Sequence, residues 1–390
     1  MRTWLICLWM LATSLATAAE PPLSYAGKTV LVTGSTDGLG RELARSFAAE
    51  GAHVIVHGRS AERGQALVEE ITASGKGSAR FIAADLSSMQ AVREFADAVA
   101  ASTPKLDLLV NNAGVAFNDG QRRTSPDGYE LQFAVNYLAG WVLVHKLRPA
   151  LKAAAPSRII NVSSGSSAPI DFNDVMLEAE GAAARGYGQS KQAQATMTKA
   201  LAPAFLADGI TMVSLHPATL MNTTMVKGIG IPPRTTVQEG VDHVMGLAHA
   251  PTLEAGAFHL EGGVPRDTMD PQGQDPEAQA KLLALSAKVG SISDNALGGW
   301  YSYRISKAAL NMLVKNLSIE VSRLNKTAAI VSIHPGTTDT ELSAPFQQNL
   351  PAGQLQSPDA TAQRLANVAA ELSAERTGFL LNWDGSTLPW

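Results

Sequence analysis

Cysteine is nearly absent from this chain, which has 390 residues and a single cysteine, Cys7. One thiol can form no disulfide within the chain, and it leaves no thiol nucleophile or thiolate metal ligand beyond residue 7. The eight histidines are scattered, and none forms the paired spacing with which a helix binds zinc. We therefore expect no disulfide and no metal site in the folded protein.

Charged residues are scarce as well, at 17% of the chain, and the formal net charge is only -4. This balance gives no sequence support for a nucleic-acid partner or a polybasic membrane face. The apolar share of 45% is ample for the core of a globular protein. The length suits one large domain with an extension.

Only the amino terminus carries a long continuous apolar run, from Trp4 to Ala12. The run follows the positive Arg2 and precedes residues 16–18 (Ala-Thr-Ala), which fit a signal-peptide cleavage site. It is short for a membrane span of about 20 residues. Residues 1–19 are therefore predicted to be a signal peptide that directs export to a periplasm or the exterior. The alternatives are an uncleaved membrane anchor and a cytoplasmic protein with a misassigned start.

From Lys28 onward, apolar strand-like runs alternate with stretches of helical spacing, including a predicted helix at Val237–Ala248. Continuous apolar strands between amphipathic helices are typical of a parallel sheet covered on both faces. We therefore predict an α/β fold, a doubly wound parallel sheet of the Rossmann type. The seven predicted strands are Thr29–Val32, His53–Val56, Arg80–Ala83, Leu106–Val110, Arg158–Val162, Ile210–Leu215 and Ala257–Leu260.

The chain also contains an internal repeat, in which residues 303–388 look like a second copy of residues 187–266. The order and approximate spacing of the matching segments agree, but too few residues precede the second copy for a second nucleotide-binding half. We predict a complete domain at 24–288 and a partial Rossmann-like half-domain at 289–390. The matching segments are Tyr187–Lys191 with Tyr303–Lys307, Val213–Pro217 with Val331–Pro335, and more loosely Gly256–Leu260 with Gly378–Asn382.

A glycine-rich turn, residues 33–40, stands between the first predicted strand and the first helix. Gly34 allows a tight turn, Gly38 allows the backbone to approach a diphosphate, and Gly40 allows close packing of helix on strand. The amino terminus of the helix presents free N–H groups to phosphate oxygens. This placement predicts a dinucleotide site.

The end of the second predicted strand indicates which dinucleotide binds. NAD enzymes carry a carboxylate there for the ribose 2′-hydroxyl, but this strand runs into His57-Gly58-Arg59-Ser60 without one. Arg59 offers a fixed positive fork for a 2′-phosphate, and Ser60 adds a hydroxyl donor. NADP(H) is therefore predicted over NAD(H).

Three residues form the predicted catalytic group. Ser164 ends the fifth strand, and the carboxyl ends of parallel strands face the ligand crevice. Tyr187 and Lys191 lie four residues apart on a predicted helix and hence on one face. The lysine ammonium is expected to lower the pKa of the phenol, so that Tyr187 can exchange a proton with a substrate oxygen during hydride transfer. Ser164 is expected to hold the same oxygen by a hydrogen bond.

These residues, with Asp85-Leu86, Asn111–Gly114, Asn136 and His216-Pro217, occur in the order seen in short-chain dehydrogenases/reductases. The chain resembles that family over residues 25 to about 288, and its stretch Ser125–Asn136 looks most like the retinol-dehydrogenase-like branch. The resemblance implies that Asn136 completes a Ser–Tyr–Lys–Asn tetrad and supports a water relay. It implies the following cofactor-binding residues: Gly34, Ser35, Thr36, Gly38, Leu39, Gly40, Arg59, Ser60, Asp85, Leu86, Asn112, Ala113, Gly114, Tyr187, Lys191, Pro217 and Thr219.

The tail resembles carbonyl-reductase-like members of the same family, which carry a segment like Gly290–Asn295 before the tyrosine. Because it has no glycine turn of its own, we interpret it as a fusion to the C-terminal half of a second such protein. Tyr303 and Lys307 are then relics or packing residues, since a proton donor without a cofactor cannot assist hydride transfer. The half-domain must pack on the first domain, pair with a second copy in a homo-oligomer, or stay poorly ordered.

Together these features predict an NADP-dependent oxidoreductase of CH–OH groups, which interconverts an alcohol with a ketone or aldehyde. Met221, Met225 and Val226 suggest a hydrophobic substrate, although a core or lid role for them is equally open. The alternative is a non-catalytic NADP(H)-binding protein, or an inactive fusion product whose tail is an interaction module.

Overall fold

The computed structural model describes residues 22–260, 265–266, 270–290, 314–315, 317–335, 337–339 and 355–388. The chain divides into two compact units, Met1–Gln279 and Ala280–Trp390. The predicted signal segment 1–19 and the second tyrosine–lysine pair, Tyr303 and Lys307, lie outside the described residues.

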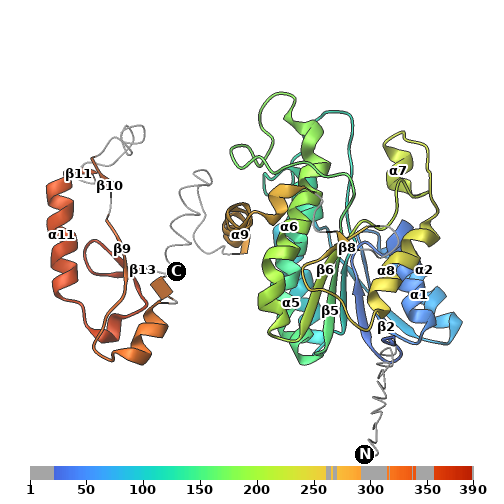
Figure 1. Cartoon of the computed structure of the whole chain (residues 1–390), viewed down its shortest axis with the longest axis horizontal. Coiled ribbons are helices and arrows are strands. Elements are labelled where there is room, and N and C mark those ends of the chain that lie inside the picture. The colour runs from blue at the N-terminus through green and yellow to red at the C-terminus, as the bar shows by residue number, and fades with distance from the viewer. Residues whose placement is uncertain are drawn as a thin grey trace, which may run out of the picture. The chain divides into compact units, whose positions relative to one another are not determined.

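The first unit is built around one eight-stranded sheet with the order β3-β2-β1-β4-β5-β6-β7-β8 (Figure 1). Neighbouring strands from β3 to β7 are parallel, and only β7 and β8 pair antiparallel. The seven parallel strands confirm the predicted doubly wound fold. The sequence pattern does not predict β8, because two residues are too few to carry a hydrophobic period. The strands are β1 (Thr29–Val32), β2 (His53–Gly58), β3 (Ser78–Ala83), β4 (Leu108–Asn111), β5 (Ser157–Val162), β6 (Ile210–Leu215), β7 (Phe258–His259) and β8 (Pro265–Arg266).

Helices cover both faces of this sheet (Figure 1). Strand residues such as Val30, Val54 and Val110 form one core cluster with apolar residues of α1, α2 and α8. The residues that alternate with them, including Leu31 and Leu109, are fully buried on the opposite face. The helices are α1 (Gly38–Ala49), α2 (Ala61–Ser74), α3 (Met89–Ser102), α4 (Leu131–Phe133), α5 (Ala139–Ala153), α6 (Gly186–Leu206), α7 (Thr224–Gly228), α8 (Val237–His249) and α9 (Pro276–Gly290).

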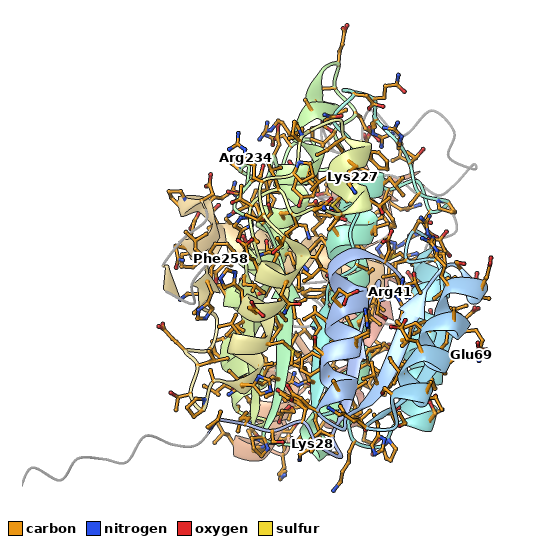
Figure 2. All side chains as sticks on the ribbon, turned by 90° about the vertical axis from the view of Figure 1, so that its right-hand side faces the viewer. Lys28, Arg41, Glu69, Lys227, Arg234 and Phe258 are labelled. Carbon is orange, nitrogen blue, oxygen red and sulfur yellow. The ribbon has the colours of Figure 1, made fainter. Side chains whose placement is uncertain are left out.

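The loops that follow the parallel strands gather at one end of the first unit. Lys28, which precedes β1, lies at one end in Figure 2, and Lys227 and Arg234 lie at the other. Lys227 lies in the last turn of α7, and Arg234 belongs to the same connection between β6 and α8. The carboxyl edge of the sheet is therefore the end at which a ligand crevice is expected.

The second unit holds a three-stranded sheet, β13-β12-β9, and a two-stranded sheet, β10-β11. Strand β12 is parallel to β9 and antiparallel to β13. Helix α11 lies before β12 in the chain, as α8 lies before β7 in the first unit. The elements are β9 (Ser332–His334), β10 (Thr337–Thr338), β11 (Leu355–Gln356), α11 (Pro358–Ala370), β12 (Leu380–Asn382) and β13 (Thr387–Leu388).

Strand pairing in the second unit agrees with that of β6, β7 and β8 when the repeated segments are aligned. Gly256 and Gly378, which stand just before β7 and β12, also share a positive φ of 85° and 78°. Both pack closely on a lysine at aligned positions, Lys199 and Lys315. The matching strand pairs are Ser214–Phe258 with Ser332–Leu380, Leu215–His259 with Ile333–Leu381, and Phe258–Arg266 with Leu380–Leu388.

Candidate active site

Two glycines of the turn, Gly34 and Gly40, have no space for a side chain. Gly34 has a φ of 64°, and a Cβ there would lie 2.9 Å from the Cα of Ala113. A Cβ at Gly40 would lie 2.3 Å from the carbonyl oxygen of Gly34. Asp37 caps α1 by accepting the N–H of Gly38. The turn thus brings bare backbone and a helix amino terminus to the crevice, which is the arrangement that fits a diphosphate.

The residues after β4 are fastened to this turn. Thr33 Oγ1 accepts the N–H groups of Asn112 and Ala113 at 2.9 and 3.0 Å. The Asn112 side chain donates to the carbonyl oxygens of Thr33 and Gly34 at 2.9 and 3.3 Å. Thr33 is a site residue that the sequence analysis missed, although a hydroxyl beside the first glycine is a usable signal.

One large cleft, of about 1990 Å³, runs from the glycine turn to the predicted catalytic residues. Most predicted site residues line it, but Ser35, Ser60 and Asn136 do not. The Ser35 hydroxyl instead donates to the carbonyl of Val32, and Ser60 caps α2. The predicted residues that line the cleft are Gly34, Thr36, Gly38, Leu39, Gly40, Arg59, Asp85, Leu86, Asn112, Ala113, Gly114, Ser164, Tyr187, Lys191, Pro217 and Thr219.

Two guanidinium groups stand at the end of β2, where one was predicted. Arg59 and Arg63 both line the cleft and are both exposed. Arg63 lies in the first turn of α2, after the N-cap Ser60, and forms an ion pair of 3.7 Å with Asp37. Its place in the first helical turn after β2 is the sequence signal that could have identified Arg63.

Ser164, Tyr187 and Lys191 meet beyond the fifth strand. The side chain of Ser164 hydrogen-bonds that of Tyr187. Lys191, which is 3% exposed, donates from Nζ to the carbonyl of Val162 at 2.7 Å and to Gln194 Oε1 at 3.3 Å. The three predicted residues are therefore brought together in the same cleft as the glycine turn.

The electrostatics of this pair differ from the expectation. Burial raises the pKa of Tyr187, although its hydrogen bond with Ser164 opposes the rise. Burial lowers the pKa of Lys191 to about 7. The expected lowering of the phenol pKa by the ammonium is not found, because Lys191 Nζ points to Val162 and lies 5.9 Å from the Tyr187 ring centre. Tyr187 is consequently a protonated phenol at neutral pH.

Asn136 lies beside the cleft and supports its wall. It belongs to a π-helical turn, Ala134–Leu138, between α4 and α5. Its side chain accepts the N–H of Val115 at 2.7 Å and donates to the Val115 carbonyl at 3.0 Å and to Ser190 Oγ at 2.9 Å. These contacts join the segment after Gly114 to α6.

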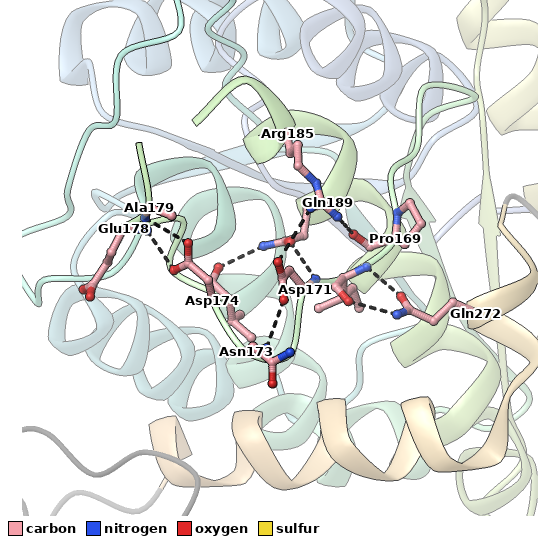
Figure 3. A network of polar contacts seen from close by, with 11 residues as sticks. Pro169, Asp171, Asn173, Asp174, Glu178, Ala179, Arg185, Gln189 and Gln272 are labelled. Atoms are coloured by element: carbon pink, nitrogen blue, oxygen red, sulfur yellow. Dashed lines mark hydrogen bonds and ion pairs between the residues drawn. The ribbon is translucent and has the colours of Figure 1, made fainter. Parts of the chain in front are cut away.

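The loop between β5 and α6 forms another wall of the cleft, through residues 165–168 and 184–185. Two glutamines hold it, as Figure 3 shows. Gln189 of α6 accepts the N–H of Asp171 and donates to the Val175 carbonyl, at 3.0 and 2.9 Å. Gln272 accepts the N–H of Ile170 and donates to its carbonyl, at 2.6 and 2.9 Å. The sequence gives no local signal for Gln272, because its partner is a backbone segment 102 residues away.

The segment that carries α7 forms an apolar border of the same cleft. Met221, Met225 and Val226 all line it, as does Ile229. The side chain of Asn118, from the loop after β4, donates to the Ile229 carbonyl at 2.7 Å. Met221 and Met225 therefore line the cleft, and the choice between a substrate-binding role and a lid role for them stays a prediction.

The residues that the structure describes contain neither a candidate metal cluster nor a candidate membrane-spanning helix. No group of three or more His, Cys, Asp or Glu side chains in that part of the chain is placed to hold a metal ion. Across the same residues, no helix combines the length and apolar character needed to cross a membrane.

A doubly wound parallel sheet with a glycine turn between its first strand and first helix defines the class of dinucleotide-binding Rossmann proteins. Within that class, the family described as short chain dehydrogenase matches residues 28–231. The chain belongs to the short-chain dehydrogenase family, as the sequence motifs indicated.

Individual relatives agree with this assignment. Retinol dehydrogenase 12 of Mus musculus is 35% identical over 199 residues, which cover 50% of this chain and 62% of that protein, less than two thirds of its length. Retinol dehydrogenase 13 of Homo sapiens is 32% identical and covers 67% of this chain and 84% of that protein. A solved complex of RhlG with NADP from Pseudomonas aeruginosa is similar at 26% identity and a TM-score of 0.52, covering 63% of this chain and 98% of that one. The family and these neighbours support a nicotinamide cofactor.

Proposed function

We propose that this protein is an NADP(H)-dependent oxidoreductase that interconverts an alcohol with a ketone or aldehyde. The observation that carries the proposal is the hydrogen-bonded pair of Ser164 and Tyr187, which shares a cleft with Lys191 and the glycine turn. A proton donor beside a dinucleotide crevice is the arrangement that carbonyl reduction requires.

The residues of the cleft divide the work as follows. Gly34, Gly38 and the start of α1 bind the diphosphate, and the bound nicotinamide supplies or accepts the hydride. Tyr187 Oη gives its proton to the substrate oxygen in reduction and takes one back in oxidation. Ser164 hydrogen-bonds the same oxygen, where negative charge develops. When protonated, Lys191 would offer a positive group to the ribose hydroxyls of the nicotinamide, as the family resemblance implies.

The preference for NADP(H) rests on charge at the end of β2. Arg59 and Arg63 line the cleft there, and β2 ends without a carboxylate. Guanidinium groups suit a 2′-phosphate, which a carboxylate at this place would repel. The RhlG complex among the structural neighbours contains NADP.

A hydrophobic substrate is proposed from the apolar lining of the cleft that also holds Tyr187. Val115, Phe117, Met221, Met225 and Ile229 all contribute apolar surface. Such a wall favours substrates whose carbonyl or alcohol carbon bears apolar groups. The named retinol dehydrogenases among the relatives agree with this class without identifying the substrate.

The test of the function is Tyr187→Phe. This change removes the proton donor and leaves the ring, so turnover of ketones and aldehydes with NADPH should be lost while NADPH binding stays within about twofold. A Tyr187→Phe enzyme that turns over at the normal rate would refute the assignment. A natural chain that binds NADPH but reduces none of a broad panel of carbonyls would favour the non-catalytic alternative.

We also propose that the second unit is a partial copy of the first and that residues 1–19 direct export. The shared strand pairings, the paired glycines and the matching order of elements support the copy. The apolar run and the Ala-Thr-Ala segment support export. Fractionation of cells that express the full chain tests the second point, because an exported protein leaves the cytoplasmic fraction and loses its first residues.

A further inference from the structure

His57 is buried beside the glycine turn, where it also contributes to the lining of the cleft. His57 is the last residue but one of β2, and its side chain is 2% exposed. Its ring packs on the ring of Phe95 from α3, with 4.5 Å between the centres. The function proposed above assigns this histidine no role.

His57 is bonded to two consecutive residues of the glycine turn. Its Nδ1 accepts the N–H of Gly34 at 2.9 Å. Its backbone N–H donates to Ser35 Oγ at 2.9 Å, and its carbonyl accepts the N–H of Ser35 at 2.8 Å. Only the first of these bonds depends on the histidine side chain, so substitution can remove it and leave the backbone pairing in place.

The chemistry of the bond fixes the state of the ring. A ring nitrogen can accept an N–H only when it carries no proton, so Nδ1 must be unprotonated. Burial lowers the pKa of His57 to about 4, which keeps the ring neutral at ordinary pH. The neutral ring therefore acts as a constant acceptor for the Gly34 amide.

Gly34 is held by contacts with two residues, Ala113 and His57. On one side Ala113 lies so close that a Cβ on Gly34 would come within 2.9 Å of its Cα. On the other side His57 holds the amide of the same residue. A turn fixed from both sides does not have to be ordered when a ligand binds, and preorganisation of this kind increases affinity.

We propose that His57 is a positioning residue for the dinucleotide, which holds the glycine turn in its diphosphate-binding form by accepting the Gly34 amide. This inference rests on the proposed function only in requiring that a dinucleotide binds the turn. Loss of the bond should weaken cofactor binding and leave the chemical step unchanged once cofactor is saturating.

Two matched substitutions isolate the bond from the bulk of the ring. Asparagine places its Oδ1 at a position comparable to Nδ1, whereas the longer glutamine side chain places its amide oxygen farther out. Both remove the contact with Phe95, so both should lower the melting temperature of the cofactor-free protein by similar amounts. His57→Gln should raise the Kd for NADPH, measured by fluorescence titration, by about fivefold to tenfold. His57→Asn should stay within about twofold of the natural protein.

A second readout uses the unaltered protein and does not depend on the folding of a variant. Hydrogen exchange followed by mass spectrometry should show the segment around Gly34 and Ser35 protected before any cofactor is added. Rapid exchange in this segment, or equal Kd values for NADPH in the two variants, would overturn the role of His57. The proposed function would still stand in that case, provided that the natural chain binds NADPH. Failure of the natural chain to bind NADPH or NADH would overturn both.

Discussion

At the scale of single residues, the protonation of Tyr187 determines how the two directions of the reaction respond to pH. Burial raises the pKa of this phenol, so it carries its proton at neutral pH and is ready to donate it. Alcohol oxidation needs the deprotonated form, whose fraction increases about tenfold per pH unit below the pKa. We therefore expect kcat/KM for oxidation to rise between pH 7 and 9, while kcat/KM for reduction does not. Paired measurements over this range, with stability checked at each pH, test the point, and a flat oxidation profile would contradict it.

Arg59 and Arg63 are similar in type but differ in their surroundings. Arg63 already pairs with Asp37 at 3.7 Å, so part of its charge is neutralised. Arg59→Ala should therefore raise the Kd for NADPH by about tenfold or more and that for NADH by less than twofold. Arg63→Ala, the matched control on the same edge of the cleft, should have the smaller effect. Equal losses for NADPH and NADH in Arg59→Ala would show that this guanidinium does not contact the 2′-phosphate.

At the scale of elements, the loop from residue 165 to 185 depends on contacts from distant parts of the chain. Gln272 binds both backbone groups of Ile170, and only an amide side chain can accept and donate in this way. Gln189 holds the next part of the loop from α6. The position of this wall of the cleft thus depends on the end of the first unit as well as on α6.

Substitution of Gln272 should separate substrate binding from cofactor binding. Gln272→Ala removes both bonds to Ile170, so we expect KM for a carbonyl substrate to rise severalfold with little change in the Kd for NADPH. Gln272→Glu keeps the acceptor but loses the donor, and its effect should be intermediate near neutral pH. Gln65→Ala, on the exposed side of α2, is the control. If Gln272→Ala changed only the Kd for NADPH and not KM for the carbonyl substrate, Gln272 would not support the substrate side of the cleft.

The same elements show what a sequence can and cannot predict about this protein. Strands β1 and β6 end at the predicted residues, because the apolar run of β1 stops just before Thr33-Gly34 and that of β6 just before His216-Pro217. Tyr187 and Lys191 are predictable because a helix fixes their separation. The hydrogen bonds of Gln272 to Ile170 and of His57 to Gly34 cannot be predicted in this way. Each involves only one or two polar side-chain atoms and joins residues that are distant in sequence. The reversed pKa expectation for Tyr187 has the same origin, since burial depends on residues from several elements.

At the scale of the whole molecule, every described residue assigned here to cofactor or substrate lies between Gly34 and Gln272, within the first unit. The strand pairings of the second unit match those of β6, β7 and β8. Its sequence has no glycine turn like residues 33–40, so we expect no second dinucleotide site there. Activity should therefore be independent of the second unit.

Two truncations test this independence against each other. A chain that ends at Gly290 keeps Gln272 and the whole of α9, which retains residues 280–290 of the second unit and removes the rest of it. Its Kd for NADPH and its kcat should match those of the full chain within about twofold. A chain that ends at residue 269 also loses Gln272 and hence the bonds to Ile170, so its KM for substrate should rise and its melting temperature should fall. The contradicting outcome is a chain ending at Gly290 that folds, as judged by circular dichroism, and yet fails to bind NADPH. That result would show that the second unit takes part in the site and that activity is not independent of it.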